Sequence, residues 1–227
     1  MNPALRRLRS VLVGVATGLV IVTVAILPFL TPSWLAFEQD RTQVTAWTGF
    51  SQADVAAVTN SIVADLVVGP PDFDVTLAGQ AVLNERERGH MRDVRTVFLG
   101  LWSMTAVGVV VLVLAARADR AATWQAAGRG ATVLAVGIVA AGAFALVAFD
   151  VLFETFHRLL FPGGSYTFDP TQERLVQLFP FQFWQETAIA VGAVIVVLAL
   201  VVRWLAGRRS GSEQTSAAHA VQPGVAT

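Results

Sequence analysis

Four long apolar stretches constrain the fold of this chain more than any other feature of its sequence. Crossing the hydrocarbon core of a bilayer takes roughly 20 residues, and each stretch is that long and almost free of charge. A segment in lipid must pair its backbone groups internally, and the stretches lack the alternation of a transmembrane strand, so they are predicted to be helices. The stretches are Val11–Leu30, Val97–Ala116, Ala131–Phe153 and Thr187–Ala206.

The placement of charge predicts how the chain is oriented. Nine of the 16 basic residues lie in the N-terminal arm, in the loop after the second stretch and from the end of the fourth stretch onward, with only Asp119 and Glu213 as acids. The other 14 acids lie in the two remaining loops, except Asp150, which lies near the end of the third stretch. Short cytoplasmic flanks are enriched in basic residues. Both termini are therefore expected in the cytoplasm and the two larger loops outside.

These features predict an all-α membrane protein with four transmembrane helices and a small, mainly helical extracellular cap. Ser51 precedes an apolar repeat at Val55, Val58, Ile62 and Leu66, which is typical of a capped amphipathic helix. Its apolar stripe is expected either on the membrane surface or against the rest of the cap. Asp169-Pro170 is typical of a second helix start.

The predicted segments follow from these elements. They are residues 1–30 (N-terminal arm and first helix), 31–96 (cap), 97–153 (second and third helices with a short cytoplasmic loop), 154–186 (second outer loop, part of the cap), 187–207 (fourth helix) and 208–227 (a disordered cytoplasmic tail).

Two of the three histidines lie at the same predicted membrane surface, each beside an acid. His90 and Asp93 are three residues apart just before the second span. Asp150, Glu154 and His157 recur at helical spacing and share one face at the end of the third span. A carboxylate near an imidazole fixes its tautomer and supports the imidazolium that forms when it takes a proton. The pattern favours a functional pair of histidines.

Other interpretations of the pair stay open. The histidines can be interfacial groups in salt bridges with acids and with Arg86, Arg92 or Arg158. Two histidines with an acid can also bind zinc, although the chain has neither cysteine nor a His-x-x-x-His motif. Haem ligation fits poorly with histidines at the interface. No Gly-x-Ser-x-Gly motif marks a nucleophilic serine. No metal site is predicted, and no nucleic-acid partner.

Aromatic residues cluster around the second outer loop. They fit an interfacial belt and equally the wall of an apolar pocket for lipid chains, and both interpretations can hold. The candidate pocket residues are Phe153, Phe156, Tyr166, Phe168, Phe179, Phe183 and Trp184.

Together the motifs resemble the lipoprotein intramolecular transacylase family. They are Glu-Arg-x-x-x-His-Met-x-Asp-Val at Glu85–Val94 and Phe-His-x-x-Leu-Phe at Phe156–Phe161, followed by Phe168-Asp169-Pro170, Leu175 and Leu178-Phe179-Pro180. The similarity covers the chain except its tail. The loop after Pro162 departs from the pattern, because it reads Gly-Gly-Ser-Tyr-Thr where a tryptophan is expected, and Phe181 stands where an acid is expected.

The resemblance implies a specific reaction in the bacterial plasma membrane. The sn-2 acyl chain of a diacylated lipoprotein moves to the α-amino group of its own N-terminal cysteine, with His90 and His157 as the catalytic pair. Asp93, Glu154, Asp150, Arg92 and Arg158 are the candidate orienting residues. The resemblance implies no cofactor, and the partners it implies are the lipoprotein substrate and membrane lipid.

Two alternatives to an acyltransferase remain. One is a non-enzymatic membrane protein whose outer cap binds a lipid or protein partner. The other is a sensor of pH or metal, which two interfacial histidines would also serve. The sequence leaves open the oligomeric state and which histidine acts as the general base.

Overall fold

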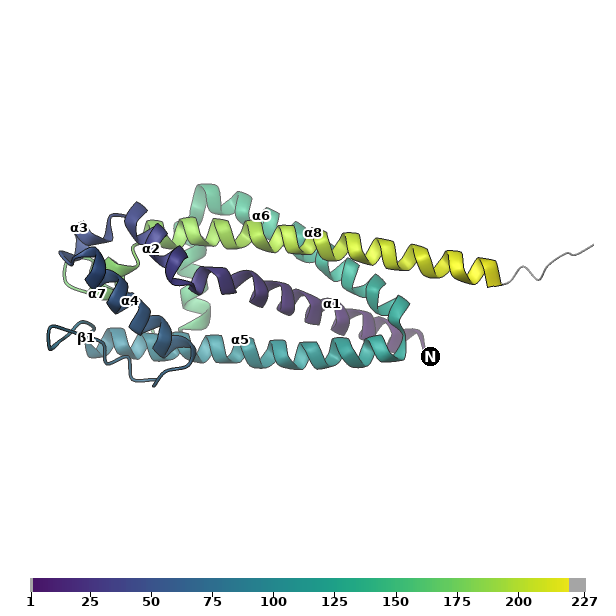
Figure 1. Ribbon diagram of the computed structural model, residues 1–227, viewed down its shortest axis with the longest axis horizontal. Coiled ribbons are helices and arrows are strands. Elements are labelled where there is room, and N and C mark those ends of the chain that lie inside the picture. The colour runs from purple at the N-terminus through teal and green to yellow at the C-terminus, as the bar shows by residue number, and fades with distance from the viewer. Residues whose placement is uncertain (1, 221–227) are drawn as a thin grey trace, which may run out of the picture. The chain divides into compact units, whose positions relative to one another are not determined.

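The computed structural model describes residues 2–220, and almost all of its regular structure is helical (Figure 1). The elements in chain order are α1 (Pro3–Ile26), the 3-10 helix η1 (Leu27–Leu30), α2 (Pro32–Arg41), α3 (Val44–Thr48), α4 (Gln52–Val67), β1 (Thr76–Leu77), β2 (Gln80–Ala81), α5 (Glu85–Ala118), α6 (Arg120–Leu160), α7 (Arg174–Leu178) and α8 (Phe181–Ala220). The predicted all-α class is confirmed.

Four helical segments in the described part of the chain are long and apolar enough to cross a membrane. They are Pro3–Leu30, Glu85–Ala118, Arg120–Leu160 and Phe181–Arg209, and each contains one of the four apolar stretches. Many of their large apolar side chains, such as Val107 and Val136, are exposed to the surroundings of the protein. Exposure of this kind suits a helix in contact with lipid.

The predicted end of the fourth helix differs from the structure. The backbone of α8 stays helical to Ala220, past the expected boundary at residue 207, so residues 208–220 are helical where a disordered tail was expected. The rest of the predicted tail, residues 221–227, lies outside the described residues.

The chain forms two compact units, which share the long helices. The first unit consists of the described residues within 1–25, 103–141 and 192–227, and the second of Ile26–Trp102 and Gly142–Val191.

Glycines allow close helix packing within the first unit. A Cβ atom built on Gly130 of α6 would lie 2.5 Å from the Cα atom of Gly14 in α1, so the two backbones touch. A Cβ atom on Gly108 of α5 would lie 3.4 Å from the Cα atom of Ala16. Small residues allow membrane helices to approach in this way, because dispersion and packing replace the hydrophobic effect as the driving force in lipid.

Arg9 of α1 forms hydrogen bonds with the end of α5 and the start of α6. Its Nη2 donates to the carbonyl oxygens of Ala115 (3.1 Å) and Asp119 (2.8 Å) and to the Thr123 hydroxyl (3.1 Å). The last carbonyls of a helix have no partner within it, and a cation is favoured beside them. Arg9 therefore ties α1 to the turn between α5 and α6.

The second unit has its own hydrophobic core, built around α4. The Ser51 hydroxyl accepts from the Asp54 N–H at 3.2 Å and begins the helix, as the sequence predicted. Val55, Val58, Ile62 and Leu66 are all buried. They pack with residues of neighbouring elements, among them Leu35, Phe73, Val75, Leu175, Leu178 and Phe183. The apolar stripe of α4 thus packs within this unit.

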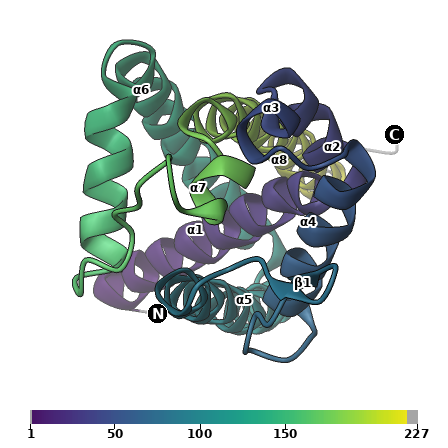
Figure 2. The same ribbon diagram turned by 90° about the vertical axis from the view of Figure 1, so that its left-hand side faces the viewer.

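The predicted helix start at Asp169-Pro170 is wrong. Residues 170–172 form a turn, and α7 begins at Arg174 with Glu173 as N-cap (Figure 2). The Asp169 carboxylate instead accepts from the N–H (2.9 Å) and hydroxyl (2.7 Å) of Thr171, which closes the turn locally. The short hairpin of β1 and β2, which turns through Ala78 and Gly79 at positive φ, was not predicted.

The C-terminal part of α6, after Ala148, is a separate helical segment. Ala148 has φ −148° and ψ 47°, which is not helical and interrupts the backbone ladder. The segment from Phe149 to Leu160 includes Asp150, Glu154 and His157, so the predicted spacing of these three residues survives on one uninterrupted piece of helix.

Candidate functional site

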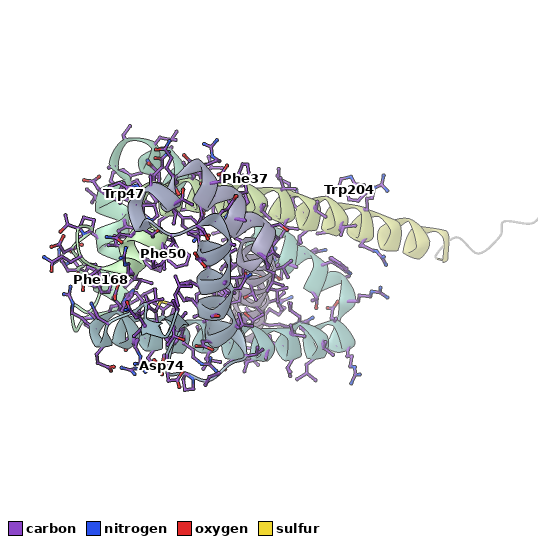
Figure 3. All side chains as sticks on the ribbon, turned by 60° about the vertical axis from the view of Figure 1, so that its left-hand side comes forward. Phe37, Trp47, Phe50, Asp74, Phe168 and Trp204 are labelled. Atoms are coloured by element: carbon purple, nitrogen blue, oxygen red, sulfur yellow. The ribbon has the colours of Figure 1, made fainter. Side chains whose placement is uncertain are left out.

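His90 lies in the second turn of α5 and is 7% exposed. Two phenylalanine rings contact it edge-on. The centroid of Phe161 lies 4.9 Å from that of His90, and the centroid of Phe168 lies 5.4 Å from it. Phe161 follows directly after α6, and Phe168 lies in the loop that leads to α7 (Figure 3).

His157 lies in the last turn of α6, and its ring faces that of His90. The two centroids are 6.1 Å apart and the planes are inclined by 25°. The His157 ring also contacts Phe153 at 4.1 Å and Tyr166 at 5.0 Å. Phe156 and Phe161 complete its aromatic surroundings, at 5.3 Å and 5.7 Å. The two histidines that the sequence singled out therefore share one aromatic enclosure.

The hydrogen bond of His157 fixes its tautomer. Its Nδ1 lies 2.7 Å from the carbonyl oxygen of Phe153. A carbonyl oxygen only accepts, so Nδ1 carries the proton and donates it. The Nε2 atom is left for other partners.

His90 has a partner that the sequence did not reveal. The Ser165 hydroxyl lies 3.4 Å from His90 Nδ1 and donates to Asp93 Oδ2 at 2.9 Å. Ser165 follows Gly164, which adopts φ 71°, a conformation that favours glycine. The turn brings the serine back toward α5. Asp93 was expected beside the imidazole, and it reaches His90 only through this serine.

The first turn of α5 is a reciprocal capping box. The Asn84 N–H donates to Glu87 Oε2 (2.7 Å), and the Glu87 N–H donates to Asn84 Oδ1 (3.0 Å). The other carboxylate oxygen of Glu87 accepts from the Leu175 N–H at 2.6 Å. Glu87 is 1% exposed. The Glu87 carboxylate therefore stabilises the N-terminus of α5 and also binds the start of α7.

Glu173 makes a second link between the same two segments. Its carboxylate accepts from Arg86 Nη2 (2.5 Å) and Nε (3.1 Å), from Asn84 Nδ2 (3.2 Å) and from the Asp169 N–H (2.7 Å). Chiefly because of the Arg86 hydrogen bond, the pKa of Glu173 lies below its usual value. Arg86 Cζ also lies 5.1 Å from the centroid of the Phe168 ring, so one guanidinium holds the loop and covers the ring that contacts His90.

The other predicted orienting residues lie elsewhere. Glu154 does not bond His157 but accepts from the Tyr166 hydroxyl at 3.0 Å. Burial and this bond raise the pKa of Tyr166. Arg92 pairs with Glu85. Asp150 and Arg158 are exposed, and no hydrogen bond or ion pair joins either to a histidine among residues 2–209.

The predicted aromatic pocket divides into two groups. Phe153, Phe156, Tyr166 and Phe168 contact the histidines. Phe179, Phe183 and Trp184 contact one another, with centroids 5.3–6.1 Å apart, and the first two belong to the core around α4. Phe161 was missing from the predicted pocket although it closes the Phe-His-x-x-Leu-Phe motif.

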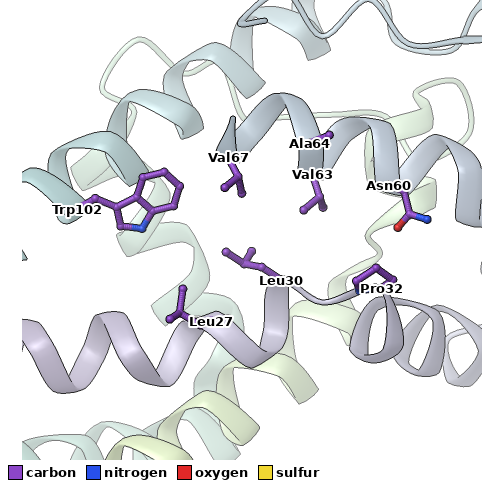
Figure 4. Close-up of a pocket in the computed structure, with 8 residues that line it drawn as sticks. All are labelled: Leu27, Leu30, Pro32, Asn60, Val63, Ala64, Val67 and Trp102. Atoms are coloured by element: carbon purple, nitrogen blue, oxygen red, sulfur yellow. The ribbon is translucent and has the colours of Figure 1, made fainter. Parts of the chain in front are cut away.

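A separate apolar pocket of about 390 Å³ lies between η1, α4 and α5 (Figure 4). Its lining contains neither histidine and one polar side chain, Asn60. The lining residues are Leu27, Leu30, Pro32, Asn60, Val63, Ala64, Val67 and Trp102. Within the described residues, no group of three or more His, Cys, Asp or Glu side chains is arranged to hold a metal ion.

Known proteins share this fold. A structure of the membrane-integral lipoprotein intramolecular transacylase Lit from Bacillus cereus is 16% identical, with a TM-score of 0.78 over 95% of this chain and 100% of that chain. A structure of the same protein with one histidine replaced by arginine has a TM-score of 0.75 and 16% identity, over 94% of this chain and 95% of that chain. No curated protein matches the sequence.

The sequence pattern of the family described as "Lipoprotein intramolecular transacylase Lit" matches residues 11–184, which is more than half of the chain. The chain belongs to the lipoprotein intramolecular transacylase family, and is a bacterial membrane enzyme of the acyltransferase type.

Proposed function

We propose that this enzyme moves the sn-2 acyl chain of a diacylglyceryl lipoprotein to the α-amino group of the lipoprotein's N-terminal cysteine, and that His90 and His157 are its catalytic residues. The juxtaposition of the two imidazoles, 6.1 Å apart in an aromatic enclosure, is the observation that carries the proposal. An imidazole can both accept and donate a proton, and two of them suit a reaction that removes one proton and supplies another.

The reaction requires a general base and a general acid. The α-amine nitrogen attacks the ester carbonyl carbon and forms a C–N bond, and it must lose a proton as it does so. The bond between the acyl carbon and the glyceryl oxygen then breaks, and that oxygen must gain a proton. One imidazole accepts the proton from nitrogen and the other supplies one to oxygen. Ester and amine become amide and alcohol, so no further reactant is needed.

The enclosure supplies proximity. Amine and ester belong to one molecule, and their encounter requires a single folded conformation of the cysteine and its glyceryl group. Holding reacting groups in such a geometry lowers a barrier by up to about 7–11 kcal/mol in favourable cases. Phe153, Phe156, Tyr166 and Phe168 present the apolar surface against which the acyl chains would lie.

The distribution of charge supports an orientation for the site. The N-terminal arm, the turn between α5 and α6 and the end of α8 are rich in arginine. We therefore place these segments, with both termini, in the cytoplasm. The two larger loops, which contain both histidines, then form the cap at the outer face. This is where lipoproteins of the bacterial plasma membrane carry their modified cysteine.

Mass spectrometry of a reporter lipoprotein tests the proposal. The enzyme is expressed in a strain whose lipoproteins are otherwise diacylated, beside the His90→Ala and His157→Ala variants, with His219→Ala as a matched control. Transfer leaves the total acyl mass unchanged, so the diagnostic signal is a fragment with an N-acyl cysteine and a monoacylglyceryl group. Loss of a proton-transfer group slows such reactions by about 100-fold to 10,000-fold.

The outcomes separate the alternatives. The fragment is expected with the wild type and with His219→Ala, and is expected to be lost in the other two variants. If the wild type yields no N-acylated fragment although it is abundant in the membrane, the proposed reaction is wrong. If both histidine variants retain full activity, the reaction stands but its assignment to these residues does not.

A further inference from the structure

We infer that Ser165 is a positioning residue that links Asp93 to His90 and leaves the His90 Nε2 atom free to accept a proton. The inference deepens the proposed function, because it rests on the catalytic role of His90 and assigns that ring the part of the general base.

The argument begins with the single proton of the serine hydroxyl. Ser165 Oγ lies 2.9 Å from Asp93 Oδ2, and an ionised carboxylate only accepts. The hydroxyl therefore donates its proton to Asp93 and faces His90 Nδ1 as an acceptor, at 3.4 Å. A proton must then reside on Nδ1. In the neutral ring Nε2 consequently holds the lone pair.

Burial and the neighbouring His157 disfavour a charged His90 ring, and the charge of Asp93 offsets part of this cost. When His90 takes a proton from the substrate amine, the positive charge lies one hydroxyl away from a carboxylate. His157 has only the carbonyl dipole of Phe153 at its Nδ1. The other ionisable groups nearby are committed elsewhere, since Arg86 pairs with Glu173 and Arg92 with Glu85. We therefore assign removal of the amine proton to His90 and donation to the glyceryl oxygen to His157.

The same geometry distinguishes Ser165 from a nucleophile. A nucleophilic serine donates its proton to the histidine that acts as its base, whereas this hydroxyl donates to Asp93. The acyl group would pass directly from oxygen to nitrogen, and no acyl ester would form on Ser165.

A spectroscopic experiment tests the link without relying on turnover. The intact protein is labelled with ¹⁵N at its histidines and purified in lipid nanodiscs, and His90→Asn identifies the signals of His90. Imidazole nitrogen shifts distinguish a protonated nitrogen from a bare one. The wild type is expected to show a protonated Nδ1 and a bare Nε2 at His90. Ser165→Ala is expected to lose this preference, Ser165→Thr to keep it, and the exposed neighbour Thr167→Ala to leave it unchanged.

Activity on the reporter lipoprotein provides the second readout. Ser165→Ala and Asp93→Asn are each expected to slow the reaction by about 10-fold to 100-fold. They should also move the acidic limb of the pH–rate profile to lower pH, because a less basic imidazole loses its proton earlier. Ser165→Thr should stay within about threefold of the wild type, since it retains the hydroxyl.

Each failure has its own signature. An unchanged tautomer and an unchanged pH profile in Ser165→Ala would overturn the inference while the proposed function stands. A wild type that carries the expected tautomer but transfers no acyl chain would instead count against the proposed function. An acyl ester trapped on Ser165 would replace the positioning role with covalent catalysis.

Discussion

The imidazole rings of His90 and His157 face each other with 6.1 Å between their centroids and 25° between their planes. One ring comes from the start of α5 and the other from the segment of α6 that follows the break at Ala148. Both Nδ1 atoms are engaged, by Ser165 and by the Phe153 carbonyl. The Nε2 atoms are therefore the pair that remains for a substrate.

Glu87 is expected to be the main attachment between α5 and α7. Glu87→Ala leaves the N–H groups of Asn84 and Leu175 without their acceptor, and the unpaired N–H of Leu175, which is buried, costs about 1–3 kcal/mol. We expect unfolding in detergent, followed by circular dichroism, to occur at a clearly lower temperature. Glu85→Gln is the control, because Glu85 lies two residues before Glu87 and is exposed. Its unfolding temperature should be close to that of the wild type.

Phe168 is expected to affect turnover more than stability. Phe168→Leu keeps apolar volume but removes the ring that contacts His90 and lies under Arg86. We expect the initial rate on the reporter lipoprotein to fall by about tenfold through loss of positioning. Phe168→Tyr should largely retain the rate. Phe37→Leu, at an exposed ring of the same unit (Figure 3), should leave the initial rate unchanged. If Phe37→Leu lowered the rate as much as Phe168→Leu, the proposed role of Phe168 at the site would be wrong.

Glu38 makes stability depend on pH. It is buried, its Oε1 has no hydrogen-bond partner among the described residues, and burial, together with the neighbouring Glu186 carboxyl, raises its pKa from 4.5 to about 7. The folded state therefore binds more protons than the unfolded state between these values. The free energy of unfolding should fall as pH rises through this window.

Glu38→Gln is expected to remove this dependence. At pH 8 the variant should be more stable than the wild type by on the order of 2 kcal/mol, while at pH 4 the two should be similar. Thermal unfolding of both proteins across this range measures the difference. A wild type whose stability does not fall between pH 5 and pH 8 would contradict the expectation.

Gly130 is expected to tolerate no side chain. In Gly130→Ala the new Cβ atom meets the backbone of Gly14, so α1 and α6 must separate, at about 1–3 kcal/mol. Gly137 lies on the same helix with nothing within 4 Å of a Cβ atom. Gly137→Ala should match or slightly exceed the stability of the wild type because alanine favours the helix. Unfolding of both variants in one detergent provides the comparison.

The elements that followed from the sequence have strong local signals. The four membrane helices follow from unbroken apolar runs, and α4 follows from a capped periodic stripe that begins at Ser51. Residues whose partners are distant in sequence were harder to predict. Asp93 and Glu154 have the helical spacing of partners for the histidines, yet each bonds a hydroxyl from the loop after α6, which no periodicity describes.

Ser165 and Glu173 show the same limit. Neither stands in a periodic segment, and each acquires its role from a turn that returns to α5. Glu87 did have a signal, because Asn84 stands three residues before it, which is capping-box spacing. Its second bond, to the N–H of Leu175, follows only from the tertiary structure.

That second bond has a consequence for how the family can diversify. Glu87 recognises a main-chain N–H of residue 175, which every amino acid except proline offers. The bond thus holds the start of α7 to α5 whatever side chain stands at position 175. The family can change that side chain without losing this attachment, whereas Ser165 and Phe168 remain constrained by their contacts with Asp93, His90 and Arg86.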